Sequence, residues 1–211
     1  MRYVPISYKI KTLVPFERLP LLNFIEWAGR TCYKSDSLYT EETGSAFLKR
    51  IMKNGHLSVI EHVHITVKFI CNRGITHELV RHRLANYSQE STRYCDYSKD
   101  IYDKSVKVIE LPEKYIDNKE VREEFDSAMR DAEIHYLRLR DLKVPAQIAR
   151  NVLPINLKTE IVTTANLREW LHIFKMRCAP DAHPQIRKMM IAVLDEFKQV
   201  LPEIYGGLNY E

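Results

Sequence analysis

Hydrophobic residues recur along the chain in two patterns, one typical of strands and one typical of helices. At residues 62–71 every second position is apolar, which places Val63, Ile65, Val67 and Phe69 on one face of a predicted strand. Alternation also predicts a strand at residues 157–166, and further strands are predicted at residues 7–16 and 105–111.

Segments with helical spacing lie between these strands. Apolar positions three and four residues apart predict helices at residues 20–33, 40–54, 73–83, 118–142, 144–154, 167–178 and 184–201. For the second of these helices Thr40 is the expected N-cap, with Glu41 and Glu42 in the first turn. Strands interspersed with helices predict a mixed α/β or α+β domain.

The composition is that of an ordinary globular protein, with 45% hydrophobic and 28% charged residues in a chain of 211. No apolar run is long enough to span a bilayer, and the first residues lack the apolar core and cleavage site of a signal peptide. We therefore expect a cytoplasmic protein that binds no membrane, with a single domain over residues 1–211.

Charge, cysteine and glycine content narrow the chemistry. A net charge of +4 suits small anions such as phosphates better than it suits a dedicated nucleic-acid binder. None of the four cysteines belongs to a C-x-x-C pair, which argues against a zinc ribbon and a dithiol redox motif. The chain has six glycines and no glycine-rich phosphate loop, so a nucleotide would be bound by other means.

A polar segment, RHRLANYSQESTRY at residues 81–94, concentrates cations, hydroxyls and amides. If Arg81 and Arg83 both lay on the preceding helix, they would point about 200° apart. Either the helix ends there and the chain turns, or the two arginines serve different ligands, or they face different chains of an oligomer. Composition alone leaves open whether residues 86–93 form a solvated capping loop or hold a phosphate and a heterocycle.

Two further arginines, Arg150 and Arg177, are embedded in apolar sequence. A guanidinium is costly to bury without a partner, so each one predicts either an internal carboxylate or an anionic ligand. Three neighbouring histidines do not predict a metal site, because Glu61 is the only acid at a suitable spacing; they are His56, His62 and His64. Four large side chains are assigned to the core rather than to a cofactor: Trp170, Phe174, Met189 and Met190.

Four motif-like segments occur in order along the chain. The first is GHLSVIEH at residues 55–62, and the second is R-H-R followed by seven residues and a serine, at residues 81–91. The others are ARNVLPINL at residues 149–157 and NLREWLHIFKMRC at residues 166–178. Together these segments resemble those of the flavin-dependent thymidylate synthases. A single R-H-R is a weak signal, but four segments in family order form a specific one.

The resemblance implies reductive methylation of dUMP to dTMP in de novo dTMP biosynthesis. Its carbon donor would be 5,10-methylenetetrahydrofolate, and its hydride carrier would be FAD reduced by NADPH. It also implies an α+β fold like that of the thymidylate synthase complementing proteins, with a central mixed or antiparallel sheet flanked by helices. The chains would assemble as a homotetramer with active sites between subunits, and neither nucleic acid nor a metal is implied.

Residues carry over from the family by their place in these motifs. The FAD contacts of the family fall on Ser58, Arg81, His82, Arg83, Gln89, Asn166, Leu167, Arg168 and His172. Its dUMP contacts fall on Glu78, Leu79, Val80, Arg81, Gln89, Glu90, Ser91, Thr92, Arg93, Arg150 and Arg177. Many members have glutamine in place of Glu78 and asparagine in place of His172, and no role carries over to Asp181 or His183.

Residue types indicate how carbon 5 of the uracil ring is activated. The R-H-R loop contains no cysteine, and Ser91 would attack only with an adjacent base, so we expect no protein nucleophile. Arg177 is the expected catalytic residue, because the resemblance places it against the uracil ring, where it would stabilise negative charge developing on the imide.

Two other classes of protein are compatible with the same residues. A nucleic-acid-binding module would use Arg81, Arg83 and Arg93 with nearby tyrosines, and it would bind with steep salt dependence and no flavin colour. A metal-dependent nucleotide hydrolase would lose its activity to a chelator.

Overall fold

The computed structural model describes residues 1–12 and 15–210, and the chain divides into two compact units. The first unit comprises Met1–Ser7, Phe69–Leu79 and Ser88–Ile161, and the second comprises Tyr8–Lys68, Val80–Tyr87 and Val162–Glu211. The single-domain organisation over residues 1–211 stays a prediction. The end of the strand predicted at residues 7–16 includes Leu13 and Val14, which lie outside the described residues.

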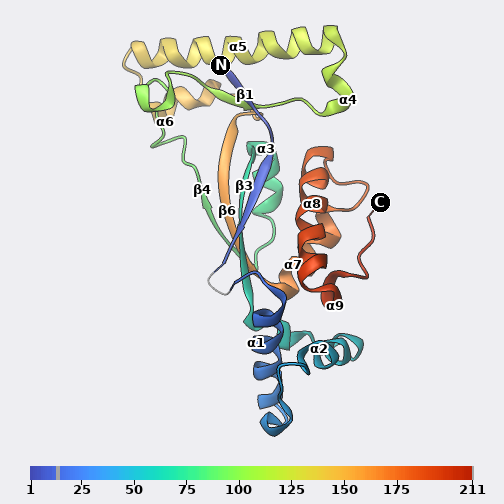
Figure 1. Ribbon diagram of the computed structural model, residues 1–211. Coiled ribbons are helices and arrows are strands. Elements are labelled where there is room, and N and C mark those ends of the chain that lie inside the picture. The colour runs from blue at the N-terminus through green and yellow to red at the C-terminus, as the bar shows by residue number, and fades with distance from the viewer. Residues whose placement is uncertain (13–14, 211) are drawn as a thin grey trace. The chain divides into compact units, whose positions relative to one another are not determined.

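Two sheets are formed (Figure 1), which confirms the predicted mixed α/β class. The larger has the order β2-β3-β6-β4, with bounds Ser7–Lys11, His64–Asn72, Lys158–Asn166 and Ala85–Gln89. The smaller pairs β1 (Arg2–Val4) in parallel with β5 (Lys107–Ile109). The predicted alternation of β3 is confirmed, because the apolar side chains assigned to one face are at most 2% exposed: Val63, Ile65, Val67 and Phe69.

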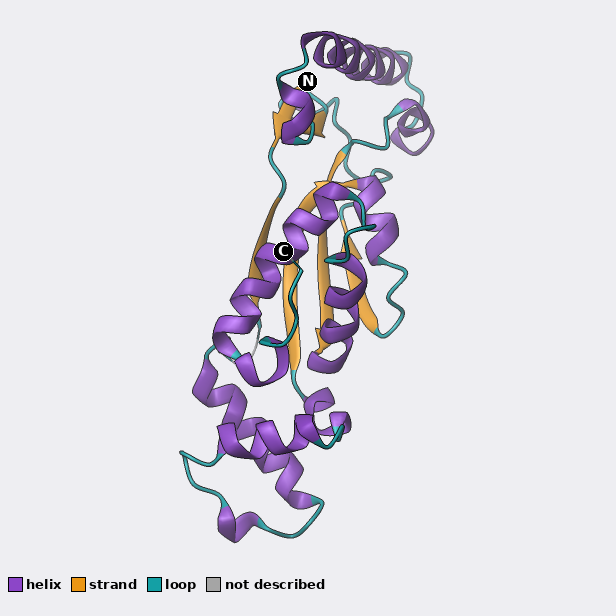
Figure 2. Cartoon of the chain, turned by 90° about the vertical axis from the view of Figure 1, so that its right-hand side faces the viewer, coloured by secondary structure: helices purple, strands orange, loops and turns teal. Residues whose placement is uncertain are grey.

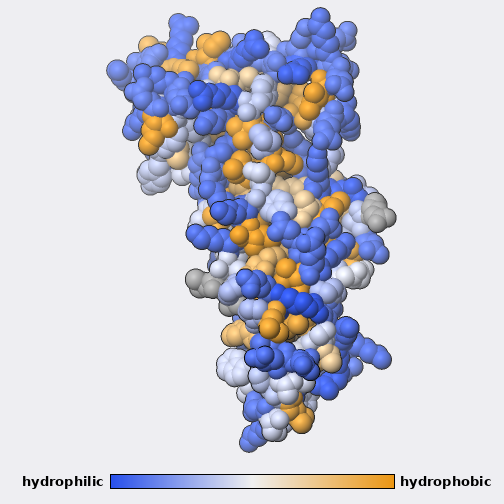
Figure 3. All heavy atoms as spheres, viewed as in Figure 1, coloured by the Kyte–Doolittle hydropathy of each residue, from blue (hydrophilic) through white to orange (hydrophobic). Residues whose placement is uncertain are grey.

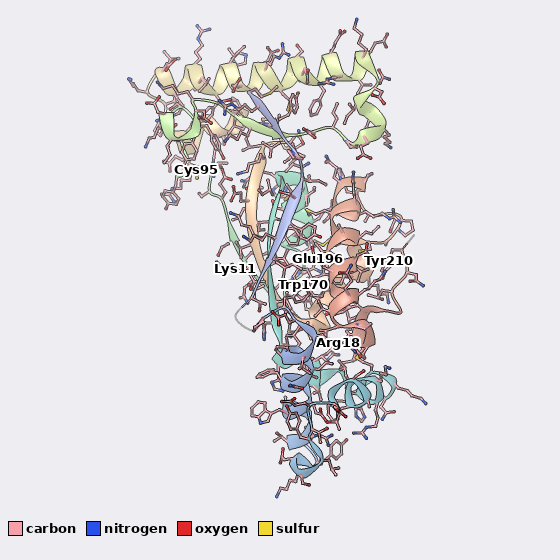
Figure 4. The ribbon with its side chains drawn as sticks, in the orientation of Figure 1. Lys11, Arg18, Cys95, Trp170, Glu196 and Tyr210 are labelled. Atoms are coloured by element: carbon pink, nitrogen blue, oxygen red, sulfur yellow. The ribbon has the colours of Figure 1, made fainter. Side chains whose placement is uncertain are left out.

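The second unit holds its core between the sheet and its C-terminal helices. Its helices are α1 (Arg18–Thr31), α2 (Gly44–Lys53), α7 (Leu167–Arg177), α8 (Pro184–Val200) and α9 (Pro202–Tyr205), with 3-10 turns η1 (Asp36–Leu38) and η2 (Leu57–His62). Helices α7 and α8 lie along the strands of this unit (Figure 2). Trp170, labelled in Figure 4, donates its Nε1–H to the Ile65 carbonyl at 3.1 Å. The core assignments are confirmed for Trp170, Phe174, Met189 and Met190.

Helix α2 begins later than the sequence pattern predicts. Thr40 is not its N-cap, and Glu41 and Glu42 precede the helix, which starts at Gly44 after Thr43. The Thr43 hydroxyl donates to the Thr40 carbonyl at 2.9 Å and accepts from the Thr40 N–H at 3.1 Å. This reciprocal pair closes a separate turn, because a threonine hydroxyl competes for backbone groups that a helix would otherwise use.

The first unit has a smaller core beneath a long helix. Its helices are α3 (Arg73–Leu79), α4 (Glu113–Ile116), α5 (Lys119–Asp141) and α6 (Ala146–Ala149), with 3-10 turns η3 (Asp100–Tyr102) and η4 (Arg150–Val152). Helix α5 buries Tyr136, and hydrophilic residues cover much of its visible surface (Figure 3). The core around Tyr136 comprises Tyr97, Val106, Val108, Ala149 and Leu157.

The helix predicted at residues 73–83 ends at Leu79, and residues 80–84 form a turn that leads into β4. Residues 85–89, predicted as part of a polar loop, are therefore an edge strand of the larger sheet. The pairing continues just past that strand, where the Glu90 N–H donates to the Glu160 carbonyl at 2.8 Å. The structure thus selects the first of the three alternatives for Arg81 and Arg83, because the helix ends and the chain turns. Among the described residues, no helix combines the length and the apolar character that a bilayer span requires.

Candidate functional site

A cavity of about 780 Å³ in the second unit collects most of the residues that the sequence assigns to the flavin. It is lined by Glu61, Arg81, His82, Arg83, Leu84, Asn166, Arg168, Glu169 and His172. Three guanidinium groups and two imidazoles face two carboxylates, so the lining favours an anionic ligand. The turn after α3 supplies Arg81, His82 and Arg83, and the start of α7 supplies most of the remainder.

His82 is the buried centre of this cavity, at 4% exposure. Its Nε2 accepts a hydrogen bond from the Arg177 Nε–H at 2.9 Å. Its Nδ1 lies 3.7 Å from Glu169 Oε1, and its ring centroid lies 5.4 Å from that of His172. The Tyr87 hydroxyl also donates to the His82 carbonyl at 2.8 Å, which fixes the backbone of the turn. Arg177 is thereby held beside the residues that line this cavity.

The electrostatics keep this histidine neutral. Burial, followed by the positive charges of Arg177 and His172, lowers the pKa of His82 to about 4. Burial raises the pKa of Glu169, an effect that the charge of His172 opposes. Burial also raises the pKa of Tyr87 to about 12. At neutral pH the His82 imidazole therefore accepts from a guanidinium and does not compete with it as a second cation.

Stability is expected to fall as the pH is lowered from about 6.5 towards 4. The unfolded chain takes up a proton at His82 near its ordinary pKa of 6.5, whereas the folded chain resists until about 4. The contribution is fully present above the unfolded pKa and amounts to about 3 kcal/mol. Urea unfolding at pH 7.5 and pH 4.5 measures it, and His82→Gln serves as the reference because it removes the titrating group. Equal pH dependence of the two proteins would contradict the prediction.

Three potential metal ligands lie together in the cavity: His82, Glu169 and His172. One ligand atom from each lies within 4.8 Å of those of the other two. This set differs from the three histidines considered in the sequence. The Arg177 N–H already occupies His82 Nε2, and the arginines of the lining oppose a cation. The arrangement therefore fits an anion with hydrogen-bonding edges better than it fits a metal ion.

Asn166 has two separate tasks at the start of α7. Its Oδ1 accepts from the Glu169 N–H at 2.8 Å, which caps the helix, while its side chain also lines the cavity. Arg168, two residues further on, is exposed and pairs with Glu61 at 2.5 Å. A capping oxygen leaves the two amide N–H donors of Asn166 for a ligand.

Asn166→Ser is expected to separate the two tasks. Serine caps helices about as well as asparagine, so the unfolding free energy should change by less than about 0.5 kcal/mol. Losing the amide donors should weaken FAD binding about fivefold to tenfold, the value of one lost hydrogen bond. Urea unfolding and flavin fluorescence titration measure the two quantities. A loss of stability with unchanged FAD affinity would show that Asn166 only caps the helix.

The predicted dUMP loop lies in the first unit, and its first two side chains are engaged within the protein. Gln89 Nε2 donates to Thr76 Oγ1 at 3.0 Å and to Thr159 Oγ1 at 3.3 Å. The Glu90 carboxylate accepts from the Tyr97 hydroxyl at 2.8 Å and pairs with Lys158 at 3.0 Å. These contacts hold the start of the loop in place against β6 and its neighbours.

In the rest of the loop, Ser91 and Thr92 accept hydrogen bonds, and Arg93 supplies an exposed donor. Arg93 is exposed, and its backbone N–H donates to Ser91 Oγ at 3.3 Å. Arg150 donates to Thr92 Oγ1 at 3.0 Å and to the Gln147 carbonyl at 3.1 Å. Both of these acceptors are neutral, so Arg150 retains its charge for an anion. Arg150 is exposed, so burial forces neither of the two alternatives predicted for it, and none of its described contacts is an internal carboxylate.

The remaining predicted residues do not line the arginine-rich cavity. Ser58 is exposed and lines a different cavity of about 550 Å³ in the second unit, together with Arg50 and His56. Leu79 and Leu167 are buried, Glu78 is half-buried and Val80 is 41% exposed. Glu169 was missed in the sequence, although a carboxylate one turn ahead of His172 on an apolar helix was a visible signal.

The fold and site define a class: an α+β protein with an arginine-lined cavity suited to phosphate-bearing ligands. Residues 21–203 match the family model described as thymidylate synthase complementing protein. The chain therefore belongs to that family.

The relatives named flavin-dependent thymidylate synthase place the chain more closely. One from Geobacter sulfurreducens is 38% identical over 185 residues, covering 84% of this chain and 78% of the relative. Another from Mycobacteroides abscessus is 35% identical over 199 residues, covering 88% and 78%. The prediction that the chain is an enzyme of this methyltransferase family is confirmed.

A solved structure supports the fold. The crystal structure of a UMP/dUMP methylase, PolB from Streptomyces cacaoi bound with 5-Br dUMP, superposes with a TM-score of 0.79. It covers 97% of this chain and 94% of its own, at 20% sequence identity.

Proposed function

We propose that this enzyme converts dUMP to dTMP by reductive methylation in de novo dTMP biosynthesis, in the cytoplasm. The carbon donor is 5,10-methylenetetrahydrofolate, and FAD reduced by NADPH carries the hydride. Family membership supports the reaction class, and a protein of related fold is named a UMP/dUMP methylase. The observation that carries the proposal here is the Arg177 guanidinium, held by neutral His82 beside a cavity with three more arginines.

The donor chemistry of the cavity fits FAD. Arg81, Arg83 and Arg168 would hold its phosphates, while His82, Asn166 and His172 offer polar groups to its other edges. When bound, the flavin supplies the hydride that completes the methyl group. Ser58 and Leu167 are proposed as further contacts, although Ser58 lines another cavity of the same chain.

The dUMP phosphate and sugar are assigned to the loop from Gln89 to Arg93 together with Arg150, and residues 78–81 supply further contacts. Within that loop Glu90 helps to hold the loop in place, because its carboxylate is bound by Tyr97 and Lys158. Arg177 faces the uracil and stabilises negative charge on its imide, an electrostatic role that grows as water is excluded.

The proposed activation of the uracil uses no protein nucleophile, and burial disfavours two of the four cysteines in that role. Burial raises the pKa of Cys71 and the pKa of Cys178 to about 12, so both thiols stay protonated at neutral pH. The described contacts of the Ser91 hydroxyl include the Arg93 N–H and no imidazole that would serve as its base.

We further propose a homotetramer whose active sites combine residues of different subunits. Ser58 lines one cavity of the chain, and the arginines line another. A single ligand would contact both groups if one chain supplied Ser58 and a second chain supplied the arginines. Large apolar side chains exposed on α1 offer a surface for such contacts, with Leu19 at 51% and Trp27 at 61% exposure. Sedimentation equilibrium tests the tetramer directly.

The function is tested by following tritium release from carbon-5-labelled dUMP. Release should require FAD, NADPH and methylenetetrahydrofolate together, and the purified protein should show flavin absorbance. Intact binding of FAD and dUMP without any release would refute the proposal. A colourless protein with steeply salt-dependent nucleic-acid binding, or one inactivated by a chelator, would favour one of the two other classes.

A further inference from the structure

Glu169 is a buried carboxylate that the proposed reaction does not yet use. It is 6% exposed and lies in the first turn of α7, with its backbone N–H tied to Asn166. Its carboxylate faces His82, with Oε1 at 3.7 Å from Nδ1. A carboxylate is costly to bury unless a neighbouring group compensates for the lost water, so its position needs a reason beyond packing.

The proton of His82 is located by its two neighbours. Arg177 Nε is always protonated, so His82 Nε2 must present a lone pair to accept its N–H at 2.9 Å. A neutral imidazole with a free Nε2 carries its proton on Nδ1, the nitrogen that faces Glu169. At 3.7 Å the contact is too long for a hydrogen bond, but a carboxylate at that distance still favours the nearby N–H dipole.

We propose that Glu169 is a positioning residue for Arg177, acting through His82. Its carboxylate holds the His82 proton on Nδ1, which leaves Nε2 free to accept from Arg177 and fixes the plane of the guanidinium. This inference rests on the proposed function for its effect on turnover, but not for its effect on His82. The same logic places a carboxylate behind the imidazole in catalytic triads, although here the imidazole aims a guanidinium and moves no proton.

The wild-type enzyme tests the first half of the proposal. In protein labelled with ¹⁵N-histidine, His82 should show a protonated Nδ1 and an unprotonated Nε2 at neutral pH, with His82→Gln used to assign the signals. A proton on Nε2 would overturn the proposal whether or not the protein methylates dUMP. This readout is independent of activity, so it separates a failure of this inference from a failure of the proposed function.

Glu169→Gln tests the second half, because it keeps the size of the side chain and removes its charge. The Nδ1-protonated population of His82 should fall, and kcat should drop about tenfold, the value of one weakened charge-assisted hydrogen bond. The KM for dUMP and the affinity for FAD should change less than about twofold. Glu169→Asp, which retains the charge, should keep the wild-type tautomer and recover part of kcat.

Glu196→Gln is the matched control in the same unit. Glu196 is a carboxylate on α8 that accepts from the Tyr8 hydroxyl and lies outside the cavity lining (Figure 4). The Glu196→Gln variant should leave the His82 signals and kcat unchanged. An unchanged His82 tautomer in Glu169→Gln, or an equal loss of kcat in Glu196→Gln, would overturn the role of Glu169. If Glu169→Gln does not fold, the wild-type tautomer and Glu169→Asp decide.

Discussion

Turnover is expected to fall about 1000-fold when Arg177 is replaced by alanine, while FAD remains bound. The guanidinium is the group placed to stabilise charge on the uracil imide, and alanine offers neither charge nor donor. The fall is expected in kcat more than in the KM for dUMP, because this interaction strengthens as the imide charge develops. Tritium release and flavin absorbance measure the two properties on the same preparation.

Lys175→Ala is the control for this variant. Lys175 lies on the same helix and is exposed, and its replacement by alanine removes the same positive charge as Arg177→Ala. It should turn over like the wild type. Near-normal turnover in Arg177→Ala would mean that the imide is stabilised by another group.

The second large effect is expected from removing both arginines of the turn, Arg81→Ala with Arg83→Ala. Both line one cavity, and each would make charge-assisted hydrogen bonds to phosphate oxygens, worth about 1.5–3 kcal/mol apiece. The dissociation constant for FAD should therefore rise by about 100-fold to 10,000-fold. Fluorescence titration with FAD measures the change, and the protein should purify without colour.

A double variant of α2, Lys49→Ala with Lys53→Ala, removes the same charge from exposed positions in the same unit. It should bind FAD as the wild type does, because neither lysine lines the arginine-rich cavity. Equal losses in the two double variants would indicate a diffuse electrostatic effect of net charge in place of a specific site.

Local periodicity was sufficient to predict the long buried elements, but not the short elements β1 and α9. The alternation of Val63, Ile65 and Val67 specifies a strand face, and the apolar stripe around Trp170 specifies α7, because each pattern reflects burial of one side. The position at which a regular element ends is decided by contacts with residues far along the sequence. Helix α3 ends at Leu79, and after a turn residues 85–89 pair as an edge strand with β6, a partner that lies far along the sequence.

The candidate site likewise has one part that the sequence predicts and another that only the fold brings together. Its arginines were found because polar residues clustered in a short segment, but their convergence on one cavity depended on the turn after Leu79. Glu169 was missed because an acid in the first turn of a helix is usually explained by the helix dipole. Its role follows from a contact with His82, and that contact is made only in the folded chain.

The four cysteines differ in their access to solvent, and this difference offers a route to a spectroscopic reporter. Cys32 is exposed, Cys95 is half-buried, and Cys71 and Cys178 are buried. A maleimide fluorophore should therefore attach first at Cys32, without the need to engineer the other thiols away. Cys32 lines the same hollow as Ser58, so the emission of the dye would register whatever enters there, in a protein that carries no other label.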